Sequence, residues 1–298
     1  MSEALIDSGI GFTIAKRHAR GRLVRLGPVL ETILANHGYP PVIERVLAEA
    51  VLLAALFGTT LKDREGQLTL QAQTEGGVID LMVADYRDGE LRGYLRHDPE
   101  RLAEAPAEPS LFGLFGKGYL ALTFDQAVTG ERYQGIVPLE GGSLAEAAES
   151  YFSQSEQIPS LVRLAVRRDA EGKHVAAGML VQHLPEGEEG RERLHTRMDH
   201  PEWEHVHALS ATVTRDELLD TGLSLEALLW RLFNEEDEVR VMPTTRFARG
   251  CRCDLDHIRG VLSRFPDSDR AEMVGDDGLI RVDCAFCAKS FGLDPLMI

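Results

Sequence analysis

Apolar residues recur in a helical pattern over residues 42–58, VIERVLAEAVLLAALFG. Pro40 and Pro41 precede this segment and Gly58 follows its last apolar residue, which is the usual order of residues at the two ends of a helix. The apolar positions occupy most of the helix circumference. A helix with so little polar surface is expected to lie inside a protein, so we predict that this one is buried.

Alternation of apolar and polar residues indicates strands on both sides of a second helix. In QLTLQAQT, residues 67–74, every second side chain is apolar, as in a strand with one face in water. Asp88-Gly89 separates two further apolar segments and is typical of a hairpin turn. The predicted strands cover 67–74, 78–86, 90–96, 118–125, 131–139, 160–168 and 174–184, with a helix over 143–157. Hairpins separated by single helices favour an α+β core domain over residues 1–185.

The pattern changes beyond this domain, where acidic residues become frequent. Residues 186–240 hold 15 Asp and Glu against 6 Arg. Thr214 and Glu217 have the spacing of a capping box. The stripe of an amphipathic helix follows at Leu225, Leu228, Leu229, Leu232 and Phe233. We predict a helical linker over residues 186–245, and because it has few apolar residues we expect it to be metastable.

The whole chain of 298 residues is acidic, with a formal net charge of −16 and a pI near 5.1. Nucleic acids and anionic membranes are bound through clustered Lys and Arg, so this charge argues against both kinds of partner. The longest apolar segment, residues 46–57, contains Glu49 and is shorter than the roughly 20 residues that a membrane span needs. The first 23 residues do not resemble a secretory signal, so we expect a cytoplasmic protein in a reducing compartment.

All four cysteines lie near the C-terminal end of the chain. Cys251 and Cys253 form a C-x-C pair, and 30 residues separate it from the C-x-x-C pair of Cys284 and Cys287. Four thiolates complete the tetrahedral coordination of zinc at about 2.3 Å, and two close pairs joined by a loop can supply them. We therefore predict one Zn²⁺ per chain, bound by a module over residues 246–298.

The spacing alone leaves two roles open for this site. The simpler role is structural, because zinc supplies about 10 to 16 kcal/mol of folding free energy in small zinc peptides. The other role is a redox switch. Arg246, Arg249 and Arg252 flank the first pair and are expected to lower thiol pKa values, which favours attack by peroxide or hypochlorous acid. Disulfide formation in both pairs would remove the zinc ligands, and the module would unfold.

Several segments resemble the 33 kDa chaperonin family of redox-regulated bacterial heat-shock proteins. The resemblance covers nearly the whole chain. Besides the cysteine motifs, it includes GRLVRLGPVLETILANHGYP at 21–40 with the helix that follows, GERYQGIVPLEGGSLAEAAESYF at 130–152, SEQIPS at 155–160 and EALLWRLFNEE at 226–236. It implies a chaperone that holds unfolding proteins without ATP, rather than an enzyme.

The resemblance also implies how such a chaperone is regulated. The reduced, zinc-bound form is inactive. Oxidation would join Cys251 to Cys253 and Cys284 to Cys287, release zinc, and unfold both the module and the adjoining linker. The activated chain would then dimerise and bind unfolding or oxidatively damaged client proteins.

Three features of the sequence depart from the family pattern. Asp254 stands where many relatives have serine, and Ala288 stands where glycine is common in zinc knuckles. Neither change removes a ligand, and Asp caps a helix as well as Ser does. The linker segment LHTRMDHPEWEHVHALS, residues 194–210, is not a family feature.

That segment and Trp230 offer two further candidate sites. A second metal site or a pH sensor could use His195, His200, His205 and His207 with Glu202 and Glu204. Irregular spacing in a polar segment is more typical of a solvated surface.

Trp230 lies off the apolar stripe of its helix, and we expect it to pack against the neighbouring domain. The alternative is a client-binding residue that becomes exposed when the linker unfolds.

Other classes of protein fit the sequence less well. A thiol oxidoreductase would place C-x-x-C in a βαβ unit, and no such unit surrounds this motif. A zinc-ribbon nucleic-acid binder needs a basic face, but residues 246–298 hold 8 Lys and Arg against 9 Asp and Glu. GLFGKGYL, residues 113–120, lacks the order of a nucleotide-binding loop, and we interpret it as a turn before a strand.

Overall fold

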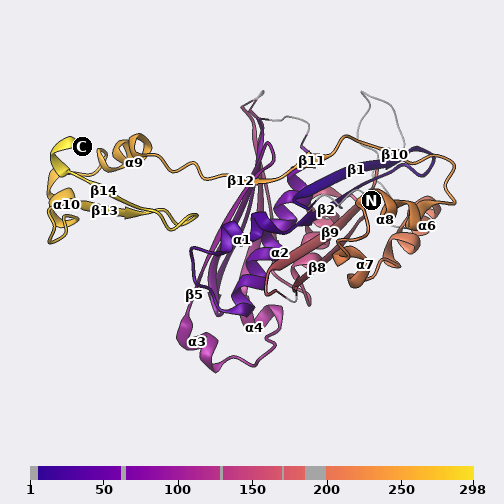
Figure 1. Cartoon of the computed structure of the whole chain (residues 1–298), viewed down its shortest axis with the longest axis horizontal. Helices are drawn as coiled ribbons and strands as arrows, with labels where there is room; N and C mark the ends of the chain where they lie inside the picture. The colour runs from indigo at the N-terminus through magenta and orange to yellow at the C-terminus, as the bar shows by residue number, and fades with distance from the viewer. Residues whose placement is uncertain (1–5, 62–64, 128–129, 170, 185–198) are drawn as a thin grey trace.

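Two β-sheets enclose one long helix at the centre of the computed structural model (Figure 1). The structure describes residues 6–61, 65–127, 130–169, 171–184 and 199–298. From one side to the other, the layers are sheet B, helix α2, sheet A and the helices of the linker. The C-terminal residues that follow the last strand of the sheets, 250–298, form a separate module, called the metal module below. It extends at one end from the two-sheet part of the molecule, called the body. The predicted α+β class is confirmed.

Sheet A is antiparallel and contains the N-terminal strands. Its four long strands, in spatial order, are β1 (Ser8–Ile14), β2 (Ala19–Leu26), β9 (His174–His183) and β8 (Ser160–Arg168). A 3₁₀ turn, Ala15–Arg17, joins β1 to β2. The sequence analysis predicted β8 and β9 but assigned no strands before residue 67. In β1, Ile10, Phe12 and Ile14 alternate with Gly9, Gly11 and Thr13, and because glycine carries no polar side chain this alternation is a weak strand signal.

Sheet B holds the five strands of the predicted central hairpins. In spatial order they are β5 (Glu90–His97), β4 (Ile79–Arg87), β3 (Gln67–Gly76), β6 (Gly116–Asp125) and β7 (Arg132–Pro138). Asp88 and Gly89 both have positive φ, 46° and 81°, so the predicted tight turn between β4 and β5 is confirmed. The inner face of the sheet is apolar and packs on α2.

Helix α2 (Pro41–Gly58) separates the two sheets, and apart from Glu49 every residue from Val46 onward is buried. The prediction of a buried helix is confirmed. Helix α1 (Pro28–Leu34) packs beside it and contributes four more buried side chains. Gly58 is the last residue of α2, and only glycine fits there, because a Cβ would lie 2.1 Å from Cγ of Tyr86. Among the described residues, no helix has both the length and the apolar character needed to cross a membrane.

The short helices of the body lie between strands. They are α3 (Pro99–Glu104), α4 (Leu111–Phe115) and α5 (Leu144–Tyr151), the last followed by a π-helical turn, Phe152–Glu156. The interpretation of residues 113–120 as a turn before a strand is confirmed, with the turn helical. Ser110 caps this helical turn by accepting a hydrogen bond from the Gly113 N–H, and β6 starts at Gly116, two residues before the predicted start.

The described part of the linker, residues 199–245, covers the face of sheet A that α2 leaves open. Its helices are α6 (Pro201–Ala211), α7 (Arg215–Leu219) and α8 (Leu225–Phe233). The predicted capping box is present, with Thr214 and Glu217 exchanging hydrogen bonds. Ten linker side chains are buried against the sheet: Trp203, Val206, Val213, Leu218, Leu219, Leu223, Leu225, Leu228, Leu229 and Phe233. The few apolar residues of the linker are thus concentrated on one sheet face, and the metastability of the linker stays a prediction.

A strap, residues 240–249, connects the linker to the metal module and runs along both sheets. Strands β10 (Arg240–Val241) and β11 (Thr245–Arg246) pair antiparallel with β1, and β12 (Ala248–Arg249) pairs in parallel with β5. Phe247 is buried between the two pairings and contacts Tyr86, with ring centroids 6.4 Å apart. The strap thus joins the edges of both sheets, and the predicted boundary between residues 245 and 246 falls inside β11.

The metal module forms the extension at the C-terminal end of the chain (Figure 1). It contains α9 (Leu255–Leu262), α10 (Asp267–Glu272), the hairpin of β13 (Ile280–Asp283) and β14 (Ser290–Leu293), and a final 3₁₀ turn, Pro295–Met297. Asp254 caps α9 by accepting a hydrogen bond from the His257 N–H at 2.7 Å, as expected for an Asp in place of Ser. The apolar core of the module consists of Leu262, Ile280, Phe291 and Leu293.

Candidate metal centre

The four cysteines come together where the metal module meets the body. Cys251 and Cys253 follow β12, while Cys284 and Cys287 lie in the turn between β13 and β14. The Sγ–Sγ distance is 3.3 Å between Cys251 and Cys253. Across the pairs it is 3.6 Å from Cys251 to Cys284 and 3.5 Å from Cys253 to Cys287. All four sulfurs lie within 4.8 Å of one another, and all four are free thiols.

This arrangement fits a tetrahedral metal ion with four sulfur ligands. With metal–sulfur bonds of about 2.3 Å, the sulfurs of such a site are about 3.8 Å apart. The observed distances lie close to this value. Among the described residues, these cysteines are the one group of His, Cys, Asp or Glu side chains placed to hold a metal ion. The cysteine cluster that the sequence predicts is therefore positioned to bind metal.

Backbone hydrogen bonds fix the second cysteine pair within its turn. The N–H groups of Cys287 and Ala288 both donate to the Cys284 carbonyl oxygen, at 3.3 and 2.8 Å. To make this turn, Ala288 adopts a φ of 54°, in the left-handed region. A Cβ makes that region unfavourable, and glycine enters it freely. The position after Cys287 thus has a geometric reason to be glycine, and alanine is strained there.

Burial and neighbouring groups shift the pKa values of three thiols. Burial raises the pKa of Cys253, and hydrogen bonds with the other sulfurs raise it further. Burial also raises the pKa of Cys284. For Cys287, hydrogen bonds from the Lys289 backbone N–H and the other thiols outweigh the effect of burial and lower the pKa to about 7. Cys287 is therefore the thiol whose surroundings favour the thiolate most clearly.

The three arginines near the first pair do not have the expected effect on the thiols. Arg246 and Arg249 belong to the strap strands that pair with β1 and β5. Arg252 turns toward the body, where it donates a hydrogen bond to the side-chain oxygen of Gln67. The expectation that they lower the thiol pKa values is wrong, since burial, backbone N–H groups and the other sulfurs cause the shifts.

The C-x-x-C turn also contacts the body through Phe286. The Phe286 ring meets the Tyr94 ring edge-on, with centroids 4.8 Å apart and planes at 81°. The guanidinium carbon of Arg92 lies 3.9 Å from the Phe286 ring centroid. A ring nitrogen of His37 lies 3.3 Å from the Phe286 carbonyl oxygen. The sequence analysis missed this contact, because an aromatic residue between two cysteines gives no sign of the partner it packs on.

The linker histidines do not form a second metal site within the described residues. His195 lies outside them. His200 accepts a hydrogen bond from the Glu202 N–H at the start of α6. The Nε2 atom of His205 lies 2.7 Å from a carboxylate oxygen of Glu236, with which it forms a hydrogen bond. His207 packs against Trp203, and Glu204 is exposed. The hypothesis of a metal site is thus wrong for the described histidines, because each has a different partner.

Trp230 is 68% exposed on α8, in the folded linker. The expectation that it packs against the neighbouring domain is wrong, because the buried stripe of α8 runs through Leu225, Leu228, Leu229 and Phe233 instead. Nor does the linker need to unfold to expose it. Trp230 stays a candidate for client contact on the ground of its exposure alone.

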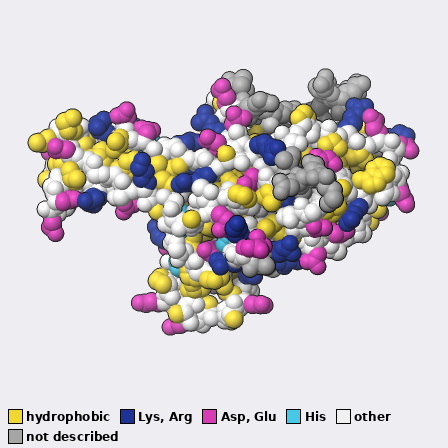
Figure 2. Space-filling view, viewed as in Figure 1, with side chains coloured by type: hydrophobic (Ala, Val, Ile, Leu, Met, Phe, Trp, Pro, Cys, Tyr) yellow, Lys and Arg dark blue, Asp and Glu magenta, His cyan; other side chains and the backbone are white. Residues whose placement is uncertain are grey.

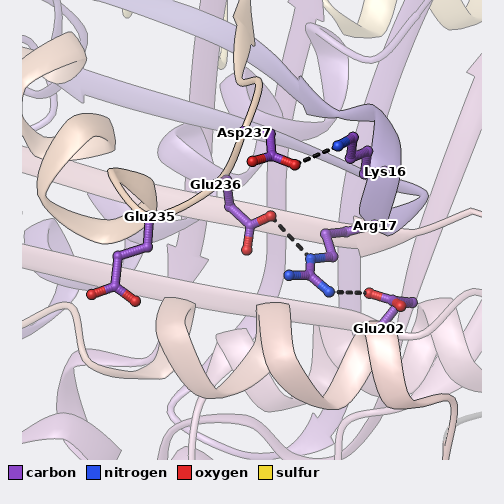
Figure 3. A pocket seen from close by; sticks show the side chains of 6 residues that line it. All are labelled: Lys16, Arg17, Glu202, Glu235, Glu236 and Asp237. Atoms are coloured by element: carbon purple, nitrogen blue, oxygen red, sulfur yellow. Dashed lines mark hydrogen bonds and ion pairs between the residues drawn. The ribbon is translucent and has the colours of Figure 1, made fainter.

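Charged groups join the linker to the body at two places. Arg25 on β2 is fully buried and donates to the carbonyl oxygens of Leu218 and Leu223, at distances from 2.7 to 3.1 Å. Near the other end of sheet A, Arg17 pairs with Glu202 at 2.6 Å and with Glu236 at 2.9 Å. Figure 3 shows these pairs, with Lys16 pointing to Asp237 beside them and Glu235 turned away.

Acidic and basic side chains are interspersed over the face of the molecule seen in Figure 2, and several Lys and Arg side chains lie at the neck of the module. The charge of the module as a whole is nearly balanced, whereas a nucleic-acid-binding zinc ribbon needs an excess of Lys and Arg. The C-x-x-C pair lies in the turn of a β-hairpin instead of the βαβ unit of a thiol oxidoreductase. Neither the charge of the module nor the hairpin position of its C-x-x-C pair favours these two classes of protein.

Comparison with known proteins agrees with this arrangement. A family model described as Hsp33 protein matches residues 7–294. The chain is 41% identical to a 33 kDa chaperonin of Caulobacter vibrioides, with 99% of each chain covered, and 34% identical to one of Shigella boydii, with 91% of this chain and 87% of the relative covered. The fold is similar to the crystal structure of a 33 kDa chaperonin of Thermotoga maritima, with a TM-score of 0.78 and 23% identity over 97% of this chain and 96% of that one. The chain belongs to the Hsp33 family of chaperones.

Proposed function

We propose that this chaperone is a redox-regulated holdase that binds unfolding proteins without ATP and catalyses no reaction. One Zn²⁺ held by Cys251, Cys253, Cys284 and Cys287 would keep the reduced form inactive. The observation that carries this proposal is the position of the four free thiols, which gather at the junction of module and body. Oxidation of these sulfurs, or loss of the metal that they bind, would therefore disturb the contact between the module and the body.

Two oxidation steps would remove the ligands of the metal. In each step, one peroxide molecule takes two electrons from a pair of cysteines, one S–S bond forms, the O–O bond breaks, and two water molecules leave after protons are taken up. A sulfenic acid formed on one cysteine would be captured by its neighbour. By the family resemblance the disulfides join Cys251 to Cys253 and Cys284 to Cys287. Since sulfurs lie at similar distances within and across the pairs, peptide mapping of the oxidised chain is the test of this pairing.

Loss of the metal would act on the linker through the strap. The module has four buried apolar side chains of its own, so without metal it has little to keep it folded. Its unfolding would free the strap, whose strands follow directly from α8. If the linker helices then leave sheet A, the apolar face that includes Ile10, Phe12 and Met179 would become accessible. Apolar surface of this kind binds unfolding proteins and would also favour dimerisation of activated chains.

The test measures zinc release and chaperone activity together. Zinc is detected with a chromogenic chelator, and the aggregation of a heat-denatured client protein is followed by light scattering, before and after treatment with peroxide at mildly raised temperature. We expect about one zinc per chain to be released as suppression of aggregation appears. A reducing compartment such as the cytoplasm would keep the chain in its inactive form.

A purely structural zinc site gives a different result in the same experiment. In that case zinc loss would only inactivate or unfold the chain, and client aggregation would not be suppressed. A variant with all four cysteines changed to serine provides the control. If this variant behaved like the reduced wild type under every redox condition, the switch would be refuted.

A further inference from the structure

Phe286 is held by the body in a site that suits an aromatic side chain. It lies between the two cysteines of the C-x-x-C pair and touches the outer face of sheet B, opposite α2. Tyr94 contacts its ring edge-on and Arg92 lies against the ring. Edge-on ring contacts and a guanidinium over a ring face are both favourable arrangements for an aromatic group. The body thus recognises Phe286 by its aromatic character.

The residues of this site are fixed by partners other than Phe286. Arg92 donates to the carboxylate of Asp85 at 2.7 Å, and the Asp85 side chain is only 3% exposed. His37 stacks on Tyr39 at 4.8 Å, and the Tyr39 hydroxyl donates to the Leu95 carbonyl oxygen. Because these contacts lie within the body, the site should keep its shape after the module leaves.

The strand register places this site at one end of a row that crosses sheet B. Tyr94 pairs with Val83, and the row continues through Gln71 and Ala121 to Ile136 at the far side. Ile136 is 55% exposed. An extended chain that placed an aromatic side chain on Tyr94 would find further apolar contact on the same face.

We infer that the outer face of sheet B around Arg92 and Tyr94 is a binding site for aromatic side chains of unfolding proteins, and that Phe286 is a tethered ligand that occupies it in the reduced chain. This inference rests on the proposed function and deepens it. Phe286 has a metal-site cysteine two residues before it and another directly after it, so release of both thiolates would free the ring. The same event that activates the chaperone would then vacate the site.

The test uses two fluorescent peptides that copy residues 283–289 with serine in place of both cysteines. One peptide keeps the phenylalanine and the other has alanine. Binding to the full-length chain is measured by fluorescence anisotropy. We expect the oxidised chain to bind the phenylalanine peptide about ten-fold more tightly than the alanine peptide, while the reduced, zinc-bound chain binds neither.

Matched variants locate the site. In the reduced state, Phe286→Ala should bind the phenylalanine peptide with its zinc retained, whereas Phe265→Ala, the same change elsewhere in the module, should not. In the oxidised state, Tyr94→Ala should lose the preference for phenylalanine, whereas Tyr119→Ala, on the same sheet face, should keep it. Tyr94→Ala leaves every metal ligand in place, so it decides the question even if Phe286→Ala impairs zinc binding.

Two results would overturn the inference. One is equal peptide binding by the oxidised Tyr94→Ala and Tyr119→Ala chains. The other is a zinc-retaining Phe286→Ala chain that binds no peptide. Client light scattering with the oxidised wild type is measured alongside: if that chain suppresses aggregation, only the inference has failed, and if it does not, the proposed function has failed.

Discussion

The linker and the metal module are adjacent in the sequence but are held in place by different kinds of contact. The linker buries ten apolar side chains against sheet A and is fixed further by hydrogen bonds from buried Arg25. The module buries four and reaches the body through Phe286, Arg252 and the strap. The linker therefore depends on the core domain for its stability, while the module, with so few buried apolar residues, is expected to depend on a bound metal.

The difference indicates that the linker has packing of its own, so under the proposed function the metal centre would control a region that it does not stabilise directly. Each fully buried large apolar side chain contributes about 1.5 to 3 kcal/mol, so the linker interface is substantial by itself. Removing the metal should act on the module first. The linker should follow only when heat or another stress weakens its own packing, so we expect oxidant together with mild heat to unfold it more completely than oxidant alone.

The largest expected effect comes from metal removal. A strong chelator added to the reduced chain at low temperature should unfold the module, because structural zinc contributes about 10 to 16 kcal/mol in small zinc peptides. Hydrogen exchange should show loss of protection in α9, β13 and β14 and retained protection in α8. Equal loss of protection in α8 at that temperature would contradict the expectation that the linker stays folded without the metal.

A cavity in the linker should destabilise the linker and leave the metal module intact. Leu228 on α8 is fully buried, and Leu228→Ala should destabilise the linker by about 2 to 5 kcal/mol. We expect early thermal unfolding of the linker with the zinc content unchanged. Glu226→Ala, at an exposed position of the same helix, is the matched control and should leave the melting curve almost unaltered. Loss of zinc from Leu228→Ala would show that the linker and the metal module do not unfold independently.

A smaller effect is expected in the turn of the metal centre. Ala288→Gly removes the strain of a positive φ and should stabilise the module by about 1 kcal/mol. Zinc should then be lost more slowly to a competing chelator. Ala285→Gly, in the same turn and without a positive φ, should have no such benefit. Equal rates of zinc loss in the two variants would argue against strain at Ala288.

The smallest effect concerns the pH dependence of the linker contact. Burial raises the pKa of Glu236, but hydrogen bonds from Arg17 and His205 outweigh it and leave the pKa below its ordinary value. Because the folded-state pKa is lowered, ionised Glu236 contributes its full stability to the fold above the unfolded-state pKa of about 4.3. This stability is lost as the pH falls through the folded-state pKa. Wild type should exceed Glu236→Gln in stability by about 0.5 to 1 kcal/mol near neutral pH, as measured by denaturant unfolding. This difference should disappear in acid, and a difference that grew in acid would be evidence against the assignment.

Local patterns were sufficient for the elements that keep one face in water or have marked ends. The alternation in β3, the Asp88-Gly89 turn, the prolines before α2 and the capping box at Thr214 all rest on contacts within a few residues. Strand β1 was missed because glycines rather than polar side chains alternate with Ile10, Phe12 and Ile14 over most of its length. The burial of ten linker side chains was not predicted, since apolar residues counted along the sequence do not reveal that they converge on one sheet face.

For the candidate site, the sequence by itself determined which residues are candidate ligands, because four thiols at these spacings suit one tetrahedral metal ion, and the motifs identify the family. Only the tertiary structure decided where that site acts. It placed the sulfurs at the neck of the module, put Phe286 on Tyr94 and Arg92, left Trp230 exposed, and turned Arg252 away from the thiols toward Gln67. These contacts join residues far apart in the chain, and their energies depend on distance and burial, which spacing along a sequence does not encode.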